Sequence, residues 1–537
     1  HGATFSSEEL HKDSPTQAVQ IGDPITQKKL SDFIMEARDL SLYRFITDNG
    51  AGGLSSSIGE MSSVCGGCEM DISKAPLKYH GLAPWEILLS EAQERMSFAV
   101  PKTKITRFLK LAAKRDVEAV VLGKFTDSGK FHIKFGNKTV AYLDLEFMHD
   151  GLPKMKLKAK WFPPKFPEPS FSDKTLREEL IAVLGRLNVC SNEFKSRQYD
   201  HEVKGISVIK PFVGSKRDVA SDATVIAISP LSKEGVILSS AILPRYSLID
   251  TYHMTASVID LAIRKIISVG GQLGQIAGLD NFCWPDPVHS EKNPDGEYKL
   301  AQLVRSNQSL YEYTKAFGVP CISGKDSMKN DSTRGGKKIS ILPSLLFSAV
   351  SRIEDISKAL TLDAKFAGDL VCVIGLTRPE LGGSEYLAML EKVGNKVPKV
   401  EAKIAIKTYQ RVSMLTSKGL LNSLHTPSIG GLAVGFAKIA IGGRLGLSID
   451  IDKIPSEDVC SASELLFSES NMRFIATISP ERMEAVSKVV SGISFAIVGR
   501  VVETQSIEFK SKKNEMANFS IPLKKLVSAY KTPLNGV

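Results

Sequence analysis

Apolar residues follow two different spacings along this chain, which predicts that helices and strands are mixed. Apolar positions three and four residues apart indicate helices, and short apolar runs bounded by glycine, proline or aspartate indicate strands. The helical spacing occurs in residues 25–45, Leu54–Met61, Thr255–Ser268 and Leu300–Phe317. The strand pattern occurs in Tyr43–Thr47, Arg95–Val100, Val117–Leu122, Lys130–Phe135, Val319–Ile322, Ser340–Val350 and Leu370–Leu376. We therefore predict an α+β (α/β mixed) protein with several lobes.

The segments between these elements also carry information. Asp127–Gly129 separates two predicted strands and is typical of a hairpin turn. Residues 161–173 contain four prolines and are predicted to be a linker. Asp48 follows a predicted strand and opens a glycine-rich turn, directly before the predicted helix at Leu54. The N-terminus of a helix favours phosphate or carboxylate groups.

Two segments of the sequence are similar and lie 378 residues apart. Each has a Gly-Gly-Leu turn, at Gly52–Leu54 and at Gly430–Leu432. Each turn is followed at the same distance by Ser-Glu-x-x-x-Arg, at Ser90–Arg95 and at Ser468–Arg473. This agreement predicts an internally duplicated fold with two related sites.

The first residues of the chain resemble a turn in the second copy. His1–Leu10 is similar to Leu381–Leu387, which closes a lobe that begins near residue 175. We therefore expect that a first N-terminal-type lobe of about 170 residues or more is missing. A processed N-terminus or a chance match is the simpler alternative. The predicted domains are the tail of the truncated lobe (1–16), a first C-terminal-type lobe (17–172), a second N-terminal-type lobe (173–377) and a second C-terminal-type lobe (378–537).

The composition argues against several classes of protein. The 537 residues are 43% apolar and 24% charged, which is ordinary for a globular protein with several domains. The longest apolar stretch is too short for a membrane span, and seven cysteines do not form a disulfide scaffold. Cys65–Cys68 has no second ligand pair for zinc. The net charge of +10 is scattered, without an arginine-rich arm or aromatic platform, so no nucleic-acid or membrane partner is expected.

Four polar clusters are candidates for chemistry, and each has a simpler structural explanation. Asp48 offers a carboxylate to Mg²⁺ or caps a helix. Ser90–Gln93 offers polar groups to a substrate or forms a surface turn. Ser323–Ser327 resembles half of a phosphate loop without the Walker spacing. Arg197–Val203 is a binding segment or an exposed edge strand. No cluster alone identifies a reaction.

Long motifs in one order, over nearly the whole chain, resemble a known family. They are HGATFSSEEL (1–10), QIGDP (20–24), ITDNGAGGLSSSIGEM (46–61), LSEAQERM (89–96), SRQYDHEVKG (196–205), LDNF (279–282), GVPCISGKDSMKND (318–331), ELGGSEYL (380–387), IGGLAVGFAKIAIGG (429–443) and LFSES (466–470). With these motifs the chain resembles the synthetase component of phosphoribosylformylglycinamidine synthase, in the aminoimidazole ribonucleotide synthetase-like superfamily.

The resemblance implies an ATP- and Mg²⁺-dependent reaction in purine biosynthesis. Formylglycinamide ribonucleotide, ATP and ammonia would give formylglycinamidine ribonucleotide, ADP and phosphate. The implied partners are a glutaminase subunit that supplies ammonia, a small accessory subunit and the missing N-terminal lobe. Since the family's catalytic residues are expected in that lobe, none is assigned here, and the segment alone is expected to be inactive. A cytoplasmic location is also expected.

The family's binding residues carry over to matching positions only. The implied substrate-binding residues are Gln20, Glu91, Gln93 and Ser327, the nucleotide-binding residues are Gly324 and Lys325, and the Mg²⁺ ligand is Asp48. Three positions depart from the family pattern. Ala92 stands where many relatives have Ser, Lys325 where many have a metal-binding Asn, and Gly278 where they have a nucleotide-binding Asp. A metal contact at Lys325 is therefore not expected.

The second copy has lost the corresponding acids. Thr426 stands where the repeat predicts the equivalent of Asp48, and Lys265 follows Arg264 where the family's first lobe has a metal-binding Asp. We therefore hypothesise that the second pseudo-site is structural, or holds phosphate without a conventional metal. Two other classes remain as alternatives: a non-catalytic nucleotide-binding protein of the same fold, and another ATP-dependent enzyme of the superfamily, such as a selenophosphate synthetase or a small-molecule kinase.

Overall fold

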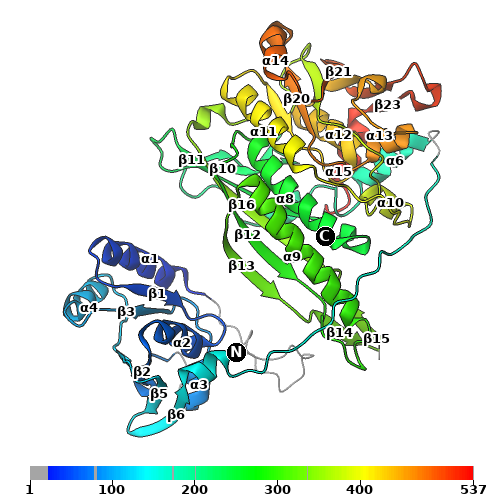
Figure 1. The fold of residues 1–537 in the computed structure, drawn as a ribbon. Helices are drawn as coiled ribbons and strands as arrows, with labels where there is room; N and C mark the ends of the chain where they lie inside the picture. The colour runs from blue at the N-terminus through cyan, green and yellow to red at the C-terminus, as the bar shows by residue number, and fades with distance from the viewer. Residues whose placement is uncertain (1–21, 78–80, 172–174, 200, 336, 536–537) are drawn as a thin grey trace. The chain divides into compact units, whose positions relative to one another are not determined.

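The computed structural model of the chain describes residues 22–77, 81–171, 175–199, 201–335 and 337–535. The chain divides into two compact units, and the division falls between Lys156 and Leu157 (Figure 1). None of the helices in these described ranges is long and apolar enough to span a membrane. The four-lobe division, with its boundary at 172, stays a prediction.

Unit 1 contains short helices and two small sheets. Its helices are α1 Pro24–Asp39, α2 Gly53–Cys65, α3 Pro84–Leu89, α4 Ile105–Lys114 and α5 Leu145–Asp150. Its strands are β1 Phe45–Asp48, β2 Cys68–Asp71, β3 Met96–Ala99, β4 Gly123–Phe125, β5 Lys130–Phe135 and β6 Lys138–Asp144. The start of α1 is encoded locally, because the Asp23 side chain accepts the Ile25 N–H and Pro24 occupies the first turn.

The two sheets of unit 1 are separate, and so are its two hydrophobic cores. One sheet pairs β1 with β3, and the other has the order β4-β2-β5-β6. Around Phe33 and Phe108, α1 and α4 form one core. Leu54, Ile72 and Phe131 belong to the second core. Among the described residues, no cluster of buried side chains joins these two cores.

Two predictions in unit 1 are wrong for the same reason. Val117–Leu122 is not a strand, and the observed strand β4 begins after it, at Gly123. Asp127–Gly129 does not close a hairpin, because β4 and β5 both pair with β2, the first antiparallel and the second parallel. Strand pairing depends on neighbours that are distant in sequence, and a local pattern does not contain them.

The first half of unit 2 is a six-stranded sheet covered by two long helices. The strand order is β13-β12-β16-β11-β10-β7. Helix α8 packs on β11 and β16, and α9 packs on α8 (Figure 1). The elements are α6 Leu176–Leu184, α7 Glu193–Ser196, β7 Ser207–Ile209, β8 Phe212–Val213, β9 Val219–Ala220, β10 Thr224–Ala227, β11 Gly235–Ile242, α8 Thr251–Ser268, β12 Ile276–Cys283, α9 Gly296–Phe317, β13 Cys321–Ser327, β14 Asp331–Arg334, β15 Lys337–Ser340 and β16 Ser344–Ile353.

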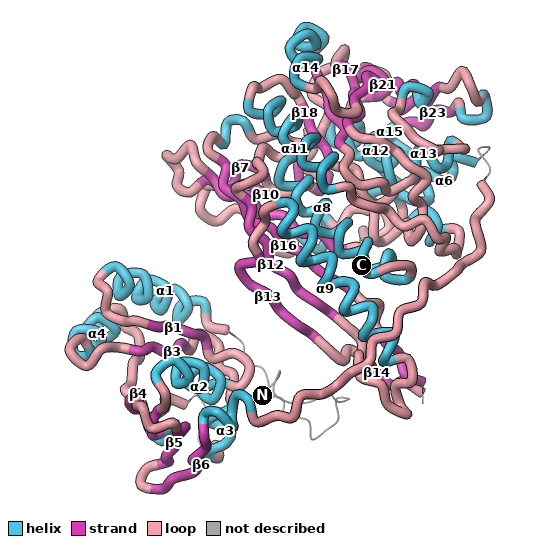
Figure 2. The backbone as a smooth tube through the Cα atoms, in the orientation of Figure 1, coloured by secondary structure: helices cyan, strands magenta, loops and turns pink. Residues whose placement is uncertain are grey.

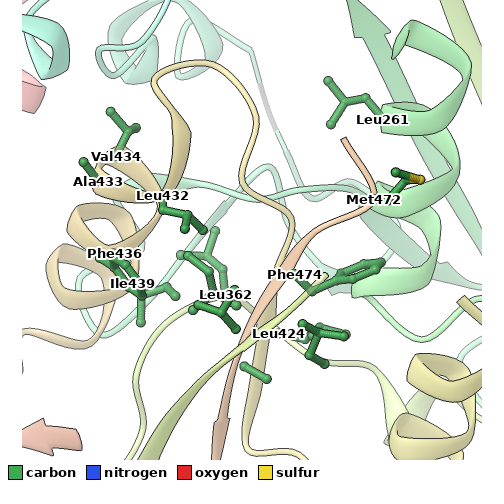
Figure 3. Close-up of a cluster of buried hydrophobic side chains, with 14 of the residues drawn as sticks. Leu261, Leu362, Leu424, Leu432, Ala433, Val434, Phe436, Ile439, Met472 and Phe474 are labelled. Carbon is green, nitrogen blue, oxygen red and sulfur yellow. The ribbon is translucent and has the colours of Figure 1, made fainter. Parts of the chain in front are cut away.

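The second half of unit 2 contains a seven-stranded sheet of order β18-β20-β17-β21-β19-β22-β23. Leu432, Phe436 and Ile439 of α12 gather with Leu424 and Phe474 from the sheet (Figure 3). One continuous core runs through the whole unit. The elements are β17 Leu370–Ile374, α10 Glu385–Met389, α11 Ala402–Ser417, β18 Ser423–His425, α12 Gly431–Gly443, β19 Gly446–Asp450, α13 Ala462–Phe467, β20 Phe474–Ile478, α14 Met483–Val489, β21 Phe495–Val502, β22 Ser506–Lys510, β23 Phe519–Pro522 and α15 Leu523–Lys531.

The order of elements in unit 1 recurs in this half of unit 2. Helices α1, α2 and α3 begin at residues 24, 53 and 84, and α11, α12 and α13 begin at 402, 431 and 462. Strands β1 and β3 begin at 45 and 96, and β18 and β20 begin at 423 and 474. Each pair is separated by 378 residues, the same offset as the sequence motifs.

The proline-rich segment lacks regular structure. Residues 161–171 contain no helix or strand (Figure 2), and residues 172 and 173 of the predicted linker lie outside the described ranges. The Trp161 ring stacks on Tyr298 of α9 with 5.4 Å between ring centroids. The Arg305 guanidinium lies 4.5 Å from the centroid of Trp161. This end of the segment is therefore anchored to unit 2.

Candidate functional site

The glycine-rich turn of unit 1 lies where the sequence predicted it, between a strand and a helix. Asp48 is the last residue of β1 and is exposed. Its Oδ1 accepts the N–H of Gly50 at 2.8 Å, so the carboxylate shapes the turn. Gly52 has φ of +81°, a left-handed conformation that glycine adopts without strain, and α2 begins at the next residue.

Asp48 fits one part of a magnesium site. No group of three His, Cys, Asp or Glu side chains that could hold a metal occurs among the described residues. Magnesium in phosphate-transfer sites commonly takes one or two carboxylates together with substrate phosphates. Asp48 therefore fits as a single protein ligand to a metal that binds together with a nucleotide.

The Ser-Glu-x-x-x-Arg loop of unit 1 is bound to this turn by a buried polar framework. Asn49 accepts hydrogen bonds from the hydroxyls of Ser57 (2.8 Å) and Ser97 (3.1 Å). Its amide donates to the carbonyl of Arg95 at 3.2 Å. The Arg95 guanidinium in turn donates to the carbonyl of Ser90. The motif's Ser and Arg are therefore structural.

This framework brings three of the predicted site residues into one region of unit 1. The N–H of Ala92 donates to the carbonyl of Asn49 at 3.3 Å, which places the loop against the turn that follows Asp48. Glu91 is half-buried and Gln93 is exposed. Asp48, Glu91 and Gln93 therefore lie close to the N-terminus of α2. Gln20 lies outside the described residues.

The predicted loop at Ser323–Ser327 is a strand in the structure, and its binding role stays a prediction. Gly324, Lys325 and Ser327 lie in β13, an edge strand that pairs in parallel with β12, with Asn281 opposite Lys325. Gly324 and Lys325 are exposed, and the carbonyl of Ser327 accepts the N–H of Trp284 at 2.8 Å. The ladder with β12 extends the strand through residues that the sequence alone placed in a loop.

The segment that begins at Arg197 is not an edge strand in its described part. Arg197 follows α7, and its Nε donates to Glu193 Oε1 at 2.6 Å, one helical turn earlier. His201 contacts the carbonyl of Ser196 at 2.7 Å through Nε2. These contacts fold the segment onto the end of α7.

The second copy of the turn is filled by a buried arginine. The Arg264 guanidinium donates to the Thr426 hydroxyl, to the Pro427 carbonyl (2.9 Å) and, through Nε, to Asp260 (2.6 Å). The Tyr409 hydroxyl donates to the other oxygen of Asp260. Arg264, Asp260 and Thr426 are at most 1% exposed. A fixed internal cation thus occupies the position beside the residue that replaces the Asp48 carboxylate.

Lys265, the other cation singled out in the sequence, has a different partner, and the cation that contacts Thr426 is Arg264. Its Nζ donates to the Ser240 carbonyl at 2.8 Å. Burial lowers the pKa of Lys265 to about 8, although the nearby Asp222 carboxylate opposes this shift. Asp222 accepts the Thr426 N–H at 2.9 Å and lies 3.0 Å from Nδ1 of His425. These groups surround the end of β18 and are internally paired.

Glu469, the counterpart of Glu91, is held inside unit 2. Its Oε1 accepts the N–H groups of Gly430 (2.8 Å) and Glu385 (3.0 Å), and its Oε2 accepts the Tyr246 hydroxyl (2.6 Å). Burial raises the pKa of Glu469 to about 7, against the opposing effect of these three donors. The carboxyl group is therefore part of the packed interior.

The raised pKa of Glu469 predicts that unit 2 loses stability as the pH rises. An unfolded glutamate has a pKa of about 4.3. At a pH between that value and about 7, the Glu469 carboxyl group is protonated in the folded state and ionised in the unfolded state. The stabilising contribution is therefore complete below about pH 4 and is lost as the pH rises through 7. The unfolding free energy of Glu469→Gln minus that of the parent should therefore increase by on the order of 3 kcal/mol from pH 4 to pH 8.

Urea denaturation of the parent and of Glu469→Gln across this pH range measures the difference. Glu484→Gln is a suitable control, because Glu484 is an exposed partner of Lys488 on α14. Parallel pH curves for the parent and Glu469→Gln would contradict the assignment.

The two copies of the turn therefore differ in how exposed their polar side chains are to solvent. In unit 1, Asp48 and Gln93 are exposed, whereas their counterparts in unit 2, Thr426 and Asn471, are 1% and 2% exposed. Two cavities, of about 440 Å³ in unit 2 and about 500 Å³ in unit 1, are lined by none of the predicted site residues. The open copy in unit 1 is thus the better candidate for ligand binding.

Comparison with known proteins shows a consistent set of relatives. The family model of the AIR synthase related protein, C-terminal domain, matches residues 1–136 and 367–512. The PurL subunit of phosphoribosylformylglycinamidine synthase from Thermococcus sibiricus is 31% identical over 522 residues, which is 96% of this chain and 69% of that protein. The PurL subunit from Alkaliphilus metalliredigens is 32% identical over 504 residues, which is 91% of this chain and 64% of that protein.

Solved structures of Thermotoga maritima PurL share the mixed α/β fold. The complex with FGAR has a TM-score of 0.64 at 20% identity and covers 93% of this chain and 69% of that chain. The complex with ATP has a TM-score of 0.62 at 20% identity and covers 90% of this chain and 68% of that chain. The structure of PurLQS has a TM-score of 0.62 at 20% identity and covers 91% of this chain and 68% of that chain. The chain thus spans about two thirds of the length of these relatives.

Proposed function

This chain belongs to the PurL family of phosphoribosylformylglycinamidine synthase subunits, and from this premise we propose that it acts in the conversion of formylglycinamide ribonucleotide into formylglycinamidine ribonucleotide. The observation that carries the proposal is the open polar region beside α2, where Asp48, Glu91 and Gln93 lie close together. It occurs in a chain that is 31% identical to a PurL subunit over 96% of its length. The FGAR complex of the Thermotoga maritima relative supports the choice of substrate.

The chemistry requires that the amide oxygen become a leaving group. The amide oxygen of the substrate is phosphorylated by ATP, and ammonia then displaces phosphate, which leaves the amidine and ADP. Asp48 would hold Mg²⁺, which would neutralise phosphate charge, and the N-terminus of α2 faces the same region. Glu91 and Gln93 bind polar groups of the ribonucleotide. Gln20, Gly324, Lys325 and Ser327 keep the substrate and nucleotide contacts that the family resemblance implies.

Separate roles are proposed for the two copies of the turn. The agreement of element order at one offset supports an internal duplication. The first copy binds ligand, and the second is structural, since Arg264 supplies its cation and Glu469 its carboxyl group from within the protein. A glutaminase subunit and a small accessory subunit are the proposed partners, which the PurLQS structure of the relative supports.

Binding of the ribonucleotide tests this proposal directly. Isothermal titration of the 537-residue chain with formylglycinamide ribonucleotide is expected to show binding. Glu91→Gln should weaken it at least about tenfold, which corresponds to roughly 1.4 kcal/mol, because a charged acceptor is lost.

The matched control is Glu60→Gln, since Glu60 is exposed on α2 and outside the loop. An unchanged affinity in Glu91→Gln would contradict the assigned site. A parent chain that binds nucleotide and no formylglycinamide ribonucleotide would favour the alternative of another superfamily protein.

A further inference from the structure

A cavity of about 440 Å³ lies in unit 2 at the start of α8. Its volume falls within the range of about 300–1,000 Å³ that is typical of small-molecule sites. The apolar part of its lining comes from Trp161, Pro163, Pro164, Ile249, Pro379 and Val397. None of the described residues assigned to substrate, nucleotide or metal lines it, so the proposed function leaves this cavity unused.

The proline-rich segment forms one wall of this cavity and is anchored on both sides of its first two prolines. Trp161 anchors one side by stacking on α9. On the other side, Asn395 Oδ1 accepts the N–H of Phe166 at 2.8 Å, and its Nδ2 donates to the Phe166 carbonyl at 2.7 Å. Pro163 and Pro164 lie between the two anchors and line the cavity. The wall is therefore preformed, which reduces the conformational entropy lost when a ligand binds.

The two carboxyl groups that line the cavity already have partners. Asp250 accepts two hydrogen bonds from the Arg305 guanidinium, at 3.1 and 2.6 Å. Glu380 accepts the backbone N–H of Lys399 at 3.0 Å, and burial raises the pKa of this carboxyl group. The negative charge of the lining is therefore either paired or reduced.

Two of the three cations that line the cavity have no such partner. Arg378 pairs with Glu401 at 2.6 Å and with Glu457 at 2.9 Å. The Nζ atoms of Lys396 and Lys399 form no hydrogen bond or ion pair with any residue in the described ranges. The lining thus offers positive charge that no described acidic side chain pairs with.

His253 of α8 adds an unpaired hydrogen-bonding group to the same lining. Its Nδ1 is buried and has no partner among the described residues. Burial lowers the pKa of His253, and Lys399 and Arg305 add to this shift against the opposing effect of Asp250. The ring is therefore neutral at pH 7. Buried groups without a partner are often explained by a bound ligand, ion or water.

We propose that this cavity binds a small organic anion with an apolar ring and two negative charges. The ring would lie against the proline wall and Val397, and the anionic group would lie toward Lys396 and Lys399. A ring nitrogen of His253 would donate a hydrogen bond to the anion. The two charges fit a phosphate monoester or a dicarboxylate. A cationic ligand does not fit, because the unpaired lysines would repel it.

Calorimetric titration of the 537-residue chain tests the site with compounds that share one ring. Phenyl phosphate carries the ring and a phosphate, phthalate carries the ring and two carboxylates, and benzyl alcohol carries the ring without charge. Phenyl phosphate or phthalate should bind saturably and at least tenfold more tightly than benzyl alcohol, and the tighter of the two identifies the anionic group. The bound anion should slow hydrogen exchange at least tenfold in residues 395–399.

A pair of matched double variants makes the test specific. Lys396→Gln/Lys399→Gln removes the unpaired charges and should weaken binding at least tenfold. Lys403→Gln/Lys407→Gln is the control, because both lysines are exposed on α11 and do not line the cavity. His253→Phe keeps a ring in place and should weaken binding about fivefold. The proposal is overturned if neither anion binds, if benzyl alcohol binds as tightly as the anions, or if Lys396→Gln/Lys399→Gln binds as tightly as the parent.

Discussion

Replacement of Arg264 by methionine is expected to destabilise unit 2 by about 3–5 kcal/mol. The guanidinium is 1% exposed and donates to Asp260, which is itself 0% exposed. Burial alone would lower the pKa of Arg264, but Asp260, Tyr409 and Asp222 together outweigh it and the net pKa is raised. Removing the cation leaves a buried carboxylate with only the Tyr409 hydroxyl as a strong donor. Urea denaturation followed by the fluorescence of Trp284, which is fully buried in unit 2, measures the loss.

Two further variants separate the buried charge from a general effect of losing an arginine. Arg352→Met breaks a surface pair with Glu234, whose side chains are 56% and 44% exposed, and should cost no more than about 1 kcal/mol. The double variant Arg264→Met/Asp260→Asn should recover part of the stability, because no uncompensated charge remains. If Arg264→Met and Arg352→Met lower the unfolding free energy by the same amount, Arg264 does not act as the internal cation of the second turn.

The elements that sequence reasoning located correctly are those with local signals. The predicted strand Lys130–Phe135 has the observed bounds of β5. The predicted helix Thr255–Ser268 lies within α8, which begins four residues earlier because Asp250 caps it by accepting the Tyr252 N–H. Apolar spacing and caps are properties of a few consecutive residues, so the sequence contains them in full.

Two of the errors concern strand partners that are distant in sequence. Val117–Leu122 has the composition of a strand but pairs with no strand in the described part of unit 1. Ser323–Ser327 was predicted to be a loop and is a strand because β12 lies beside it. In both cases the neighbouring strand decides the conformation, and its identity depends on the fold.

The candidate site was predictable in part for the same reason. The position of Asp48 at a strand end follows from local pattern, and the structure places Glu91 and Gln93 near it through the contact of Ala92 with Asn49. The role of Arg264 was missed, because its partner Thr426 is 162 residues away. One signal was available: Asp260 and Arg264 are four residues apart on one helix, which is the spacing of an ion pair.

The Ser-Glu-x-x-x-Arg loop packs so closely against each glycine turn that one methyl group added to the turn should disrupt the contact. We expect Gly431→Ala to destabilise unit 2 by at least about 3 kcal/mol. Gly431 has φ of +68°, and an added Cβ would lie 2.6 Å from the Leu466 carbonyl oxygen and 2.7 Å from that of Ser468. Both contacts are to backbone, so no side chain can move aside, and the loop that holds Glu469 must shift.

Gly318→Ala is the matched control, because Gly318 has φ of +67° and no atom lies within 4 Å of its added Cβ. It should cost only about 1 kcal/mol, the cost of the left-handed conformation itself. The counterpart Gly53 in unit 1 would place its Cβ 2.3 Å from the Ser90 carbonyl oxygen. Gly53→Ala should therefore displace the loop that carries Glu91 and weaken ribonucleotide binding, whereas Gly431→Ala should lower stability and leave binding unchanged. Equal effects of both variants on binding would show that the two copies of the turn share one role.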